Sequence, residues 1–212
     1  MNKTVFVTEV FTSIQGESTW AGLPCFFVRL SGCNLRCGYC DTTHAYPQGR
    51  KTPVTALVKR FAASSAALAE ITGGEPLAQP GFLDLAAGLV KAARGRPVLV
   101  ETNGSLDISV IPKDVIAIVD VKCPGSGEAA AMDPLNLERL RPRDEVKFVV
   151  GGRRDFDWAK RLVKKHGLAA RHEVLFSPVS GQLEAGVLAS WVLACGLPVR
   201  VQCQLHKMLG VK

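Results

Sequence analysis

The sequence predicts an α/β fold with a mostly parallel sheet, arranged either as an open doubly wound sheet or as a barrel. Two observations lead to this prediction. Short apolar, β-branched segments alternate with helical patterns along the 212 residues. Polar motifs follow several of these segments directly, where the carboxyl ends of parallel strands gather ligands. We find no internal repeat, linker or domain boundary, so we expect a single domain over residues 1–212.

Seven segments are predicted to be strands because they are short, apolar and rich in β-branched residues. These segments are residues 25–30, 68–71, 97–100, 115–121, 146–150, 174–176 and 198–201. Helical periodicity appears between them at residues 82–93, 156–165 and 183–194. Asp155 is placed to cap the second of these helices. Strands that alternate with helices indicate right-handed crossovers and parallel pairing.

Composition and cysteine content narrow the class of protein. Hydrophobic residues make up 47% of the chain, which is enough for one compact domain with a sizeable core. No apolar stretch approaches the ~20 residues that span a bilayer, and the N-terminus has no signal-peptide pattern. We therefore expect a cytoplasmic protein with no membrane partner. In that compartment the seven cysteines favour metal ligation over disulfides.

The chain is basic, with a formal net charge of +7 from 26 basic and 19 acidic residues. The basic residues are densest at residues 139–154 and 160–171. Aromatic residues do not interleave with them, as they do on surfaces that bind single-stranded nucleic acid. We interpret the charge as a solvated surface and expect no nucleic-acid partner, whereas anionic small ligands suit a basic protein.

Three cysteines, Cys33, Cys37 and Cys40, lie in one short loop after the first predicted strand. Structural zinc sites and ferredoxin clusters usually take four protein ligands. Three cysteines instead leave one iron of a 4Fe-4S cluster open for a substrate or cofactor. A closed zinc site is the structural alternative, with His44 or one of the other cysteines as the fourth ligand.

The loop from Gly32 to Asp41 reads Gly-Cys-Asn-Leu-Arg-Cys-Gly-Tyr-Cys-Asp and resembles the cluster loop of radical S-adenosylmethionine (SAM) enzymes. In that family the open iron chelates SAM, and an electron from the cluster cleaves SAM to a 5′-deoxyadenosyl radical. The resemblance implies that the three cysteines hold a 4Fe-4S cluster and so enable radical generation. It also implies a set of SAM-binding residues. They are Tyr39, Cys40, Asp41, Gly74, Glu75, Asn103, Asp120 and Lys122.

The motif Thr72-Gly73-Gly74-Glu75-Pro76 adds to this resemblance. Its glycines permit close backbone approach, and Glu75 offers a carboxylate to the cofactor's ammonium group. Lys122 resembles a family lysine that pairs with the cofactor's carboxylate or ribose. Taken alone, the glycine motif is also compatible with an ordinary turn, and residues 101–104 with a polar exit from a strand.

The region before the cysteines indicates a branch of this family. Residues 11–17 end in Ile-Gln-Gly-Glu, and together with residues 22–33 they resemble the 7-carboxy-7-deazaguanine synthases of queuosine biosynthesis. Members of that lyase family contract 6-carboxy-5,6,7,8-tetrahydropterin to 7-carboxy-7-deazaguanine with loss of ammonia, and they require magnesium. The resemblance therefore implies a partial, trimmed radical SAM (β/α) barrel, a homodimer and a reductant such as flavodoxin or ferredoxin.

The same resemblance assigns residues to the pterin substrate and to Mg2+. Backbone groups of residues 14–16 and the side chains of Gln15 and Glu17 suit a pterin edge, and Arg29 suits the substrate carboxylate. The implied substrate-binding residues are Ile14, Gln15, Gly16, Glu17, Arg29, Thr72, His206 and Lys212. Thr42 supplies the implied oxygen ligand for Mg2+, and helix capping by residues 41–43 is the alternative.

Two other functions fit parts of the pattern. A glycyl-radical-enzyme activase shares the cluster loop, the Gly-Gly-Glu-Pro motif and an Asp-x-Lys strand end. Activases usually carry His-Asn after the last cysteine, whereas this chain has Asp41-Thr42. A non-enzymatic zinc or iron-sulfur module with a basic face is the second alternative.

Overall fold

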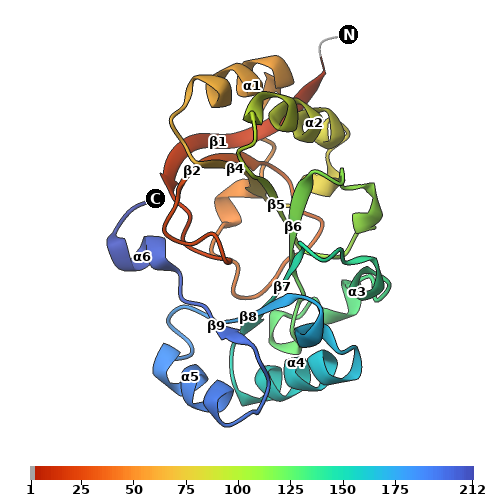
Figure 1. Cartoon of the computed structure of the whole chain (residues 1–212), viewed down its shortest axis with the longest axis vertical. Helices are drawn as coiled ribbons and strands as arrows, with labels where there is room; N and C mark the ends of the chain where they lie inside the picture. The colour runs from red at the N-terminus through yellow and green to blue at the C-terminus, as the bar shows by residue number, and fades with distance from the viewer. Residues whose placement is uncertain (1–2) are drawn as a thin grey trace.

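The computed structural model describes residues 3–212 and shows an α/β fold built on one nine-stranded sheet (Figure 1). The strands are β1 (Thr4–Ile14), β2 (Pro24–Leu30), β3 (Arg50–Pro53), β4 (Leu68–Gly73), β5 (Val98–Thr102), β6 (Val115–Asp120), β7 (Glu145–Val150), β8 (Glu173–Pro178) and β9 (Arg200–Val201). The helices are α1 (Val54–Ala63), α2 (Phe82–Ala93), α3 (Asn136–Arg139), α4 (Arg153–Lys165), α5 (Ala185–Leu193) and α6 (Leu205–Leu209). The prediction of a mostly parallel α/β fold with fewer helices than strands is confirmed.

The sheet is a partial barrel. Its strands lie in the order β3-β1-β2-β4-β5-β6-β7-β8-β9. β1 pairs antiparallel with β2 and with β3, and every pair from β2 to β9 is parallel. The sheet curls around the coil that follows β2, and helices cover its outer face (Figure 1). Because β9 pairs only with β8, a gap remains between the C-terminal edge of the sheet and the β1–β2 side.

Alternation along the strands gives the sheet two different faces. The outer face packs against the helices in a large core that includes Val28, Ile71 and Leu85. A smaller apolar cluster fills one end of the inner face. It consists of Cys25, Phe27, Leu68, Leu99, Ile116 and Ile118. Toward the carboxyl ends of the same strands, the next inner positions are polar: Arg29, Glu70, Thr72, Glu101 and Asp120. The inner face is therefore apolar at one end and charged at the other.

All seven predicted strands and all three predicted helices are present, with boundaries that differ by up to three residues. The prediction for Asp155 is wrong in its position. Gly152 is the N-cap of α4, and Asp155 lies inside the first turn. There its carboxylate accepts hydrogen bonds from the backbone N–H groups of Gly125 and Gly151, at 2.8 and 3.0 Å. It thus ties the start of α4 to the loop after β6.

Five elements were not predicted: β1, β3, α1, α3 and α6. β1 is rich in β-branched and aromatic residues, and it buries Val5 and Val7 while their neighbours stay half-buried, as expected for a strand with one face against the core. α1 buries Val54, Leu57 and Phe61 along one face. Over residues 3–212, no helix has the length and apolar character needed to cross a membrane.

Candidate active site

A cavity of about 260 Å³ opens at the carboxyl ends of the parallel strands. It brings together every site residue predicted from the sequence except Glu75. The predicted residues that line it are Ile14, Gln15, Gly16, Glu17, Arg29, Cys33, Cys37, Tyr39, Cys40, Asp41, Thr42, Thr72, Gly74, Asn103, Asp120, Lys122, His206 and Lys212. Residues nearly 200 positions apart in the chain therefore share one wall.

The three cysteines lie half-buried on this cavity, in the coil after β2. The glycine motif after β4 packs against that coil. A Cβ atom on Gly74 would lie 1.9 Å from the carbonyl oxygen of Gly32, and the backbone N–H of Glu75 donates to the same oxygen at 2.8 Å. Only glycine allows this approach. The cysteine loop and the glycine motif, which the family resemblance assigns to one cofactor site, are therefore in direct contact.

Polar groups surround the cysteine sulfurs. The backbone N–H of Leu35 donates to Cys33 Sγ at 3.5 Å, and Asn103 Nδ2 lies 3.8 Å from the same sulfur. Thr42 Oγ1 lies 3.6 Å from Cys40 Sγ. Donors of this kind stabilise thiolates, which are the ligands that iron-sulfur clusters require. The donor set therefore fits a cluster held by three cysteines.

His44 does not join the cysteines. Its Nε2 lies 3.6 Å from the carboxylate of Glu9 on β1. Within residues 3–212, no group of three His, Cys, Asp or Glu side chains is arranged to hold a single metal ion.

Glu75 is placed differently from the expectation. Its side chain is fully buried and outside the cavity lining. Its carboxylate accepts hydrogen bonds from the backbone N–H groups of Leu77 and Asn103, at 3.0 and 2.7 Å, and from Thr102 Oγ1 at 2.8 Å. Burial raises the pKa of this carboxyl in spite of these donors. In this arrangement Glu75 holds the turn after β5 against the glycine motif, and the contact with the cofactor's ammonium group stays a prediction.

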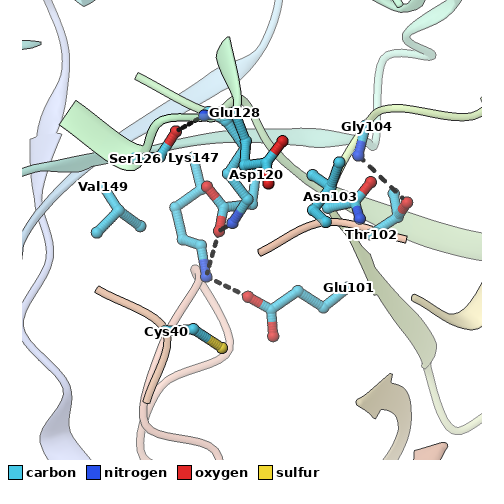
Figure 2. Close-up of polar contacts among 12 residues, drawn as sticks. Cys40, Glu101, Thr102, Asn103, Gly104, Asp120, Ser126, Glu128, Lys147 and Val149 are labelled. Carbon is cyan, nitrogen blue, oxygen red and sulfur yellow. Dashed lines mark hydrogen bonds and ion pairs between the residues drawn. The ribbon is translucent and has the colours of Figure 1, made fainter. Parts of the chain in front are cut away.

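An ion-pair network crosses the inner face beside the cysteines. Lys147 on β7 is 4% exposed, and its ammonium group pairs with Glu17 at 2.8 Å. The same group pairs with Glu101 (Figure 2). Asp120 lies 3.9 Å from the same nitrogen and pairs with Lys122 at 2.6 Å. Burial alone would lower the pKa of Lys147, but the carboxylates of Glu101 and Glu17 outweigh burial and raise it. Lys147 is therefore a fixed positive charge.

Gln15 and its neighbours form the wall on the β1–β2 side. Gln15 Nε2 donates to Glu70, and Gln15 Oε1 accepts from the backbone N–H of Glu17 at 2.9 Å. Arg29 pairs through Nε with Glu9 at 2.8 Å. Thr72 Oγ1 lies 3.2 Å from Glu101 Oε2. Of the side chains that the sequence assigned to the substrate, Arg29 and Thr72 thus occupy neighbouring inner positions of β2 and β4.

The C-terminal segment folds back over this wall (Figure 1). The backbone N–H of Leu205 donates to the carbonyl of Gly16 at 2.9 Å, and a Cβ atom on Gly16 would lie 1.9 Å from His206 Nδ1. Gln204 Nε2 donates to Glu17 at 2.8 Å, and Lys207 pairs with Asp41 at 2.7 Å. This contact supports the sequence-based placement of His206 at the site.

Comparison with known proteins identifies the family. The sequence profile of the Radical SAM superfamily matches residues 27–167. A protein from Koribacter versatilis named 7-carboxy-7-deazaguanine synthase is 41% identical over 96% of both chains. The chain belongs to the 7-carboxy-7-deazaguanine synthase family of radical SAM enzymes. Another member, from Chlorobaculum tepidum, is 44% identical and covers 96% of this chain and 93% of its own.

The fold of this radical SAM enzyme has a solved counterpart. The crystal structure of QueE from Escherichia coli superposes with a TM-score of 0.77 over 96% of this chain and 95% of that one, at 24% identity. The prediction of a trimmed radical SAM barrel is thereby confirmed. Family membership also confirms that the protein is an enzyme of the 4Fe-4S and SAM type, and that the activase and the zinc module are not favoured.

Three charged residues on the strands around the enzyme's cavity were not assigned from the sequence: Glu70, Glu101 and Lys147. The segment containing Glu101 was singled out, but its carboxylate was not. A signal was present for the other two, because Glu70 and Lys147 each interrupt an apolar strand. A charge inside such a strand is expensive to bury unless it serves a site or a partner.

Proposed function

We propose that the enzyme contracts 6-carboxy-5,6,7,8-tetrahydropterin to 7-carboxy-7-deazaguanine with loss of ammonia, in queuosine biosynthesis. The observation that carries this proposal is the meeting of the three cysteines, the Ile14–Glu17 segment and Arg29 on one cavity. The same chain is 41% identical over nearly its full length to a protein named for that product.

Cys33, Cys37 and Cys40 are proposed as the ligands of the 4Fe-4S cluster. When bound, the cluster and SAM together supply a 5′-deoxyadenosyl radical. Seven cavity residues are proposed to bind SAM: Tyr39, Cys40, Asp41, Gly74, Asn103, Asp120 and Lys122. Lys122 suits the cofactor's carboxylate or ribose. Burial lowers its pKa, but Asp120 and Cys37 together raise it by more, so it stays charged. Glu75 supports this region from behind the cavity wall.

The substrate is proposed to lie against the β1–β2 wall. Arg29 binds its carboxylate with the two terminal nitrogens that its Glu9 pair leaves free, since Glu9 takes the Nε hydrogen. Gln15, Glu17 and the backbone of Ile14 and Gly16 bind the pterin edge. Thr72, His206 and Lys212 complete the proposed binding residues.

Mg2+ is proposed to bind at Thr42 together with the substrate carboxylate. Mg2+ usually takes one or two protein oxygens and completes its shell with water and ligand oxygens, so a single threonine hydroxyl suits it. Thr42 lines the cavity next to Cys40, on the side from which the tail reaches Asp41. Titrating Mg2+ into the reaction tests this assignment, because Thr42→Ala should raise the Mg2+ concentration required for half-maximal rate.

The enzyme's partners follow from this chemistry. A low-potential reductant such as flavodoxin or ferredoxin is proposed to supply the electron. We further propose a cytoplasmic location and a homodimer, as the family resemblance implies.

The experiment that tests the function is anaerobic reconstitution with iron and sulfide, followed by reduction with SAM, Mg2+ and the tetrahydropterin. Mass spectrometry should detect 7-carboxy-7-deazaguanine. 5′-Deoxyadenosine without that product would reject the substrate and favour the activase. A protein with four irons that yields neither compound would reject the enzymatic proposal.

A matched set of cysteine variants tests the cluster ligands. Replacing any one of Cys33, Cys37 or Cys40 by alanine should abolish SAM cleavage, because a cluster held by two cysteines is not retained. Cys203→Ala is the control, since Cys203 is exposed and lies outside the cavity. It should cleave SAM at the wild-type rate. Cleavage that survives in a loop variant would contradict the assignment.

A further inference from the structure

Glu70 is a buried carboxylate on the wall of the cavity. It lies on β4, one inner position deeper than Thr72, and its strand neighbour on β2 is Phe27. The residue is 3% exposed and lines the cavity. The inner apolar cluster, with Leu68 as the preceding inner residue of β4, lies beneath it. Glu70 therefore stands where the apolar part of the inner face changes to the charged part.

Glu70 differs from the other acidic residues of the cavity in its partners. Glu17 and Glu101 pair with Lys147, Asp120 pairs with Lys122, and Asp41 pairs with Lys207. In the described part of the chain, Glu70 forms no ion pair within 4.0 Å. Its Oε2 accepts from Gln15 Nε2, and no hydrogen bond reaches its Oε1 from residues 3–212. One carboxylate oxygen is thus available to a ligand.

The surroundings of Glu70 make it unfavourable to keep an ionised carboxylate there without a partner. Burial raises the pKa of its carboxyl, and the nearby carboxylates of Glu101 and Glu17 raise it further. Such an arrangement destabilises the empty protein, and it is typical of groups that bind a ligand rather than of groups that support a fold. Hydrogen-bond donors from a ligand would offset the cost.

We propose that Glu70 is a specificity-determining residue that accepts hydrogen bonds from the ring N–H and the exocyclic amine of the substrate's 2-amino-4-oxopyrimidine ring. The two donors lie side by side and match the two oxygens of a carboxylate, because Oε2 keeps a second lone pair beside the one that Gln15 uses. This inference rests on the proposed function, because it takes the pterin as the ligand. It adds to the Gln15 and Glu17 contacts a carboxyl group whose ionised form the two donors of the ligand would stabilise.

The layout of charges on neighbouring strands supports this orientation. Arg29 on β2 faces Thr72 on β4, and Glu70 lies two residues deeper. Along a strand this step is about 6–7 Å. A ligand with an anionic carboxylate at one end and an N–H edge at the other would meet Arg29 near the mouth and Glu70 further inside. The reverse orientation would place the ligand carboxylate against Glu70.

The test compares two ligands on reconstituted enzyme with SAM bound. 7-Carboxy-7-deazaguanine keeps the 2-amino-4-oxopyrimidine edge, and its 2-desamino analogue lacks the amine. Calorimetry should show that wild-type enzyme binds the amino compound more tightly. Glu70→Gln should weaken the amino compound by about 10- to 100-fold, as expected for hydrogen bonds to a charged group. Binding of the desamino analogue should fall much less.

Glu138→Gln is the matched control, because Glu138 is exposed on α3. It should bind both ligands as wild type does, and iron content and unfolding temperature show that each variant is folded. Equal weakening of both ligands by Glu70→Gln would overturn the proposal and assign Glu70 to the positioning of Gln15. Equal affinity of wild type for both ligands would also overturn it, independently of any variant. If wild type makes no deazapurine, the proposed function itself fails.

Discussion

Lys147 illustrates how single residues hold the site together. Its ammonium group lies near Glu101 and Asp120 (Figure 2). It also pairs with Glu17, and only 4% of the residue is exposed. Burial raises the pKa of Glu17, but the ion pair with Lys147 and the hydrogen bond from Gln204 together outweigh burial and lower it. The loop after β1 is thereby joined to β5 and β7 through one side chain.

Replacing Lys147 by methionine should destabilise the enzyme by about 3–5 kcal/mol, because it leaves buried carboxylates without a counter-charge. The free energy of unfolding in urea measures this. Lys164→Met is the control on the exposed side of α4, and it should change that free energy by less than about 0.5 kcal/mol. Equal effects of the two substitutions would show that the network does not stabilise the fold.

At this scale the sequence predicts residues that belong to motifs and misses residues that depend on the curvature of the sheet. The cysteines, Gly74 and Lys122 are recognisable from their neighbours in the chain. Glu70 and Lys147 can be recognised as site residues only in the folded sheet, where β4 and β7 direct these side chains into the same cavity. The misplacement of Asp155 has a similar cause, because its partners, Gly125 and Gly151, include a loop 30 positions away.

The C-terminal element α6 is a short helix that depends on tertiary contacts. Its five residues are too few to be stable as an isolated helix. It is held by the Leu205–Gly16 backbone bond and by the Lys207–Asp41 pair, which connect it to the β1–β2 loop and the cysteine loop. The position of α6 therefore depends on the positions of both loops.

The substitution Gly16→Ala should displace α6. Its Cβ would meet His206 Nδ1 at 1.9 Å and the His206 backbone nitrogen at 2.7 Å, and backbone cannot move aside as a side chain can. We expect the KM for the pterin to rise by about tenfold or more, equivalent to about 1.4 kcal/mol of lost binding. Steady-state kinetics measures it.

Gly186→Ala is the control for this substitution, because a Cβ at Gly186 in α5 meets nothing within 4 Å. Its KM should match that of wild type. An unchanged KM in Gly16→Ala would show that α6 does not contribute to substrate binding.

Elements with strong local signals were predicted well. α2 is amphipathic and ends where Arg94 and Gly95 adopt left-handed conformations, so both its ends are visible in the sequence. β1 was not predicted, since apolar and polar residues do not alternate along it. α6 gives almost no local signal, since it forms only against Gly16.

The whole molecule is built around one large hydrophobic core, which lies between the outer face of the sheet and the helices. This core extends from Val5 on β1 to Phe176 on β8 and includes Leu188 of α5. The inner apolar cluster connects the middle strands from within. No strand from β1 to β8 lacks a member of one of these clusters except the short β3. The described residues thus share their hydrophobic stabilisation.

We predict that the chain unfolds as a single domain. In urea, the far-ultraviolet circular dichroism and tryptophan fluorescence of the cluster-free protein should give coincident transitions, because the core has no boundary at which one part would unfold first. Two separated transitions would contradict the single-domain proposal. The control is Leu188→Ala, which should shift both signals together to a lower midpoint.

The gap in the sheet is the place where the barrel is held together by the fewest backbone hydrogen bonds. Everywhere else, separating two neighbouring strands would break a ladder of backbone hydrogen bonds. Across the gap, the described residues are joined by one backbone bond, from Leu205 to Gly16, and by side chains such as Gln202 and Gln204 that reach Glu17. Thermal breathing will therefore concentrate there. The gap can therefore widen without breaking the strand ladders of the barrel, whereas the start of the cysteine loop stays held to the motif after β4 by the Glu75–Gly32 backbone bond.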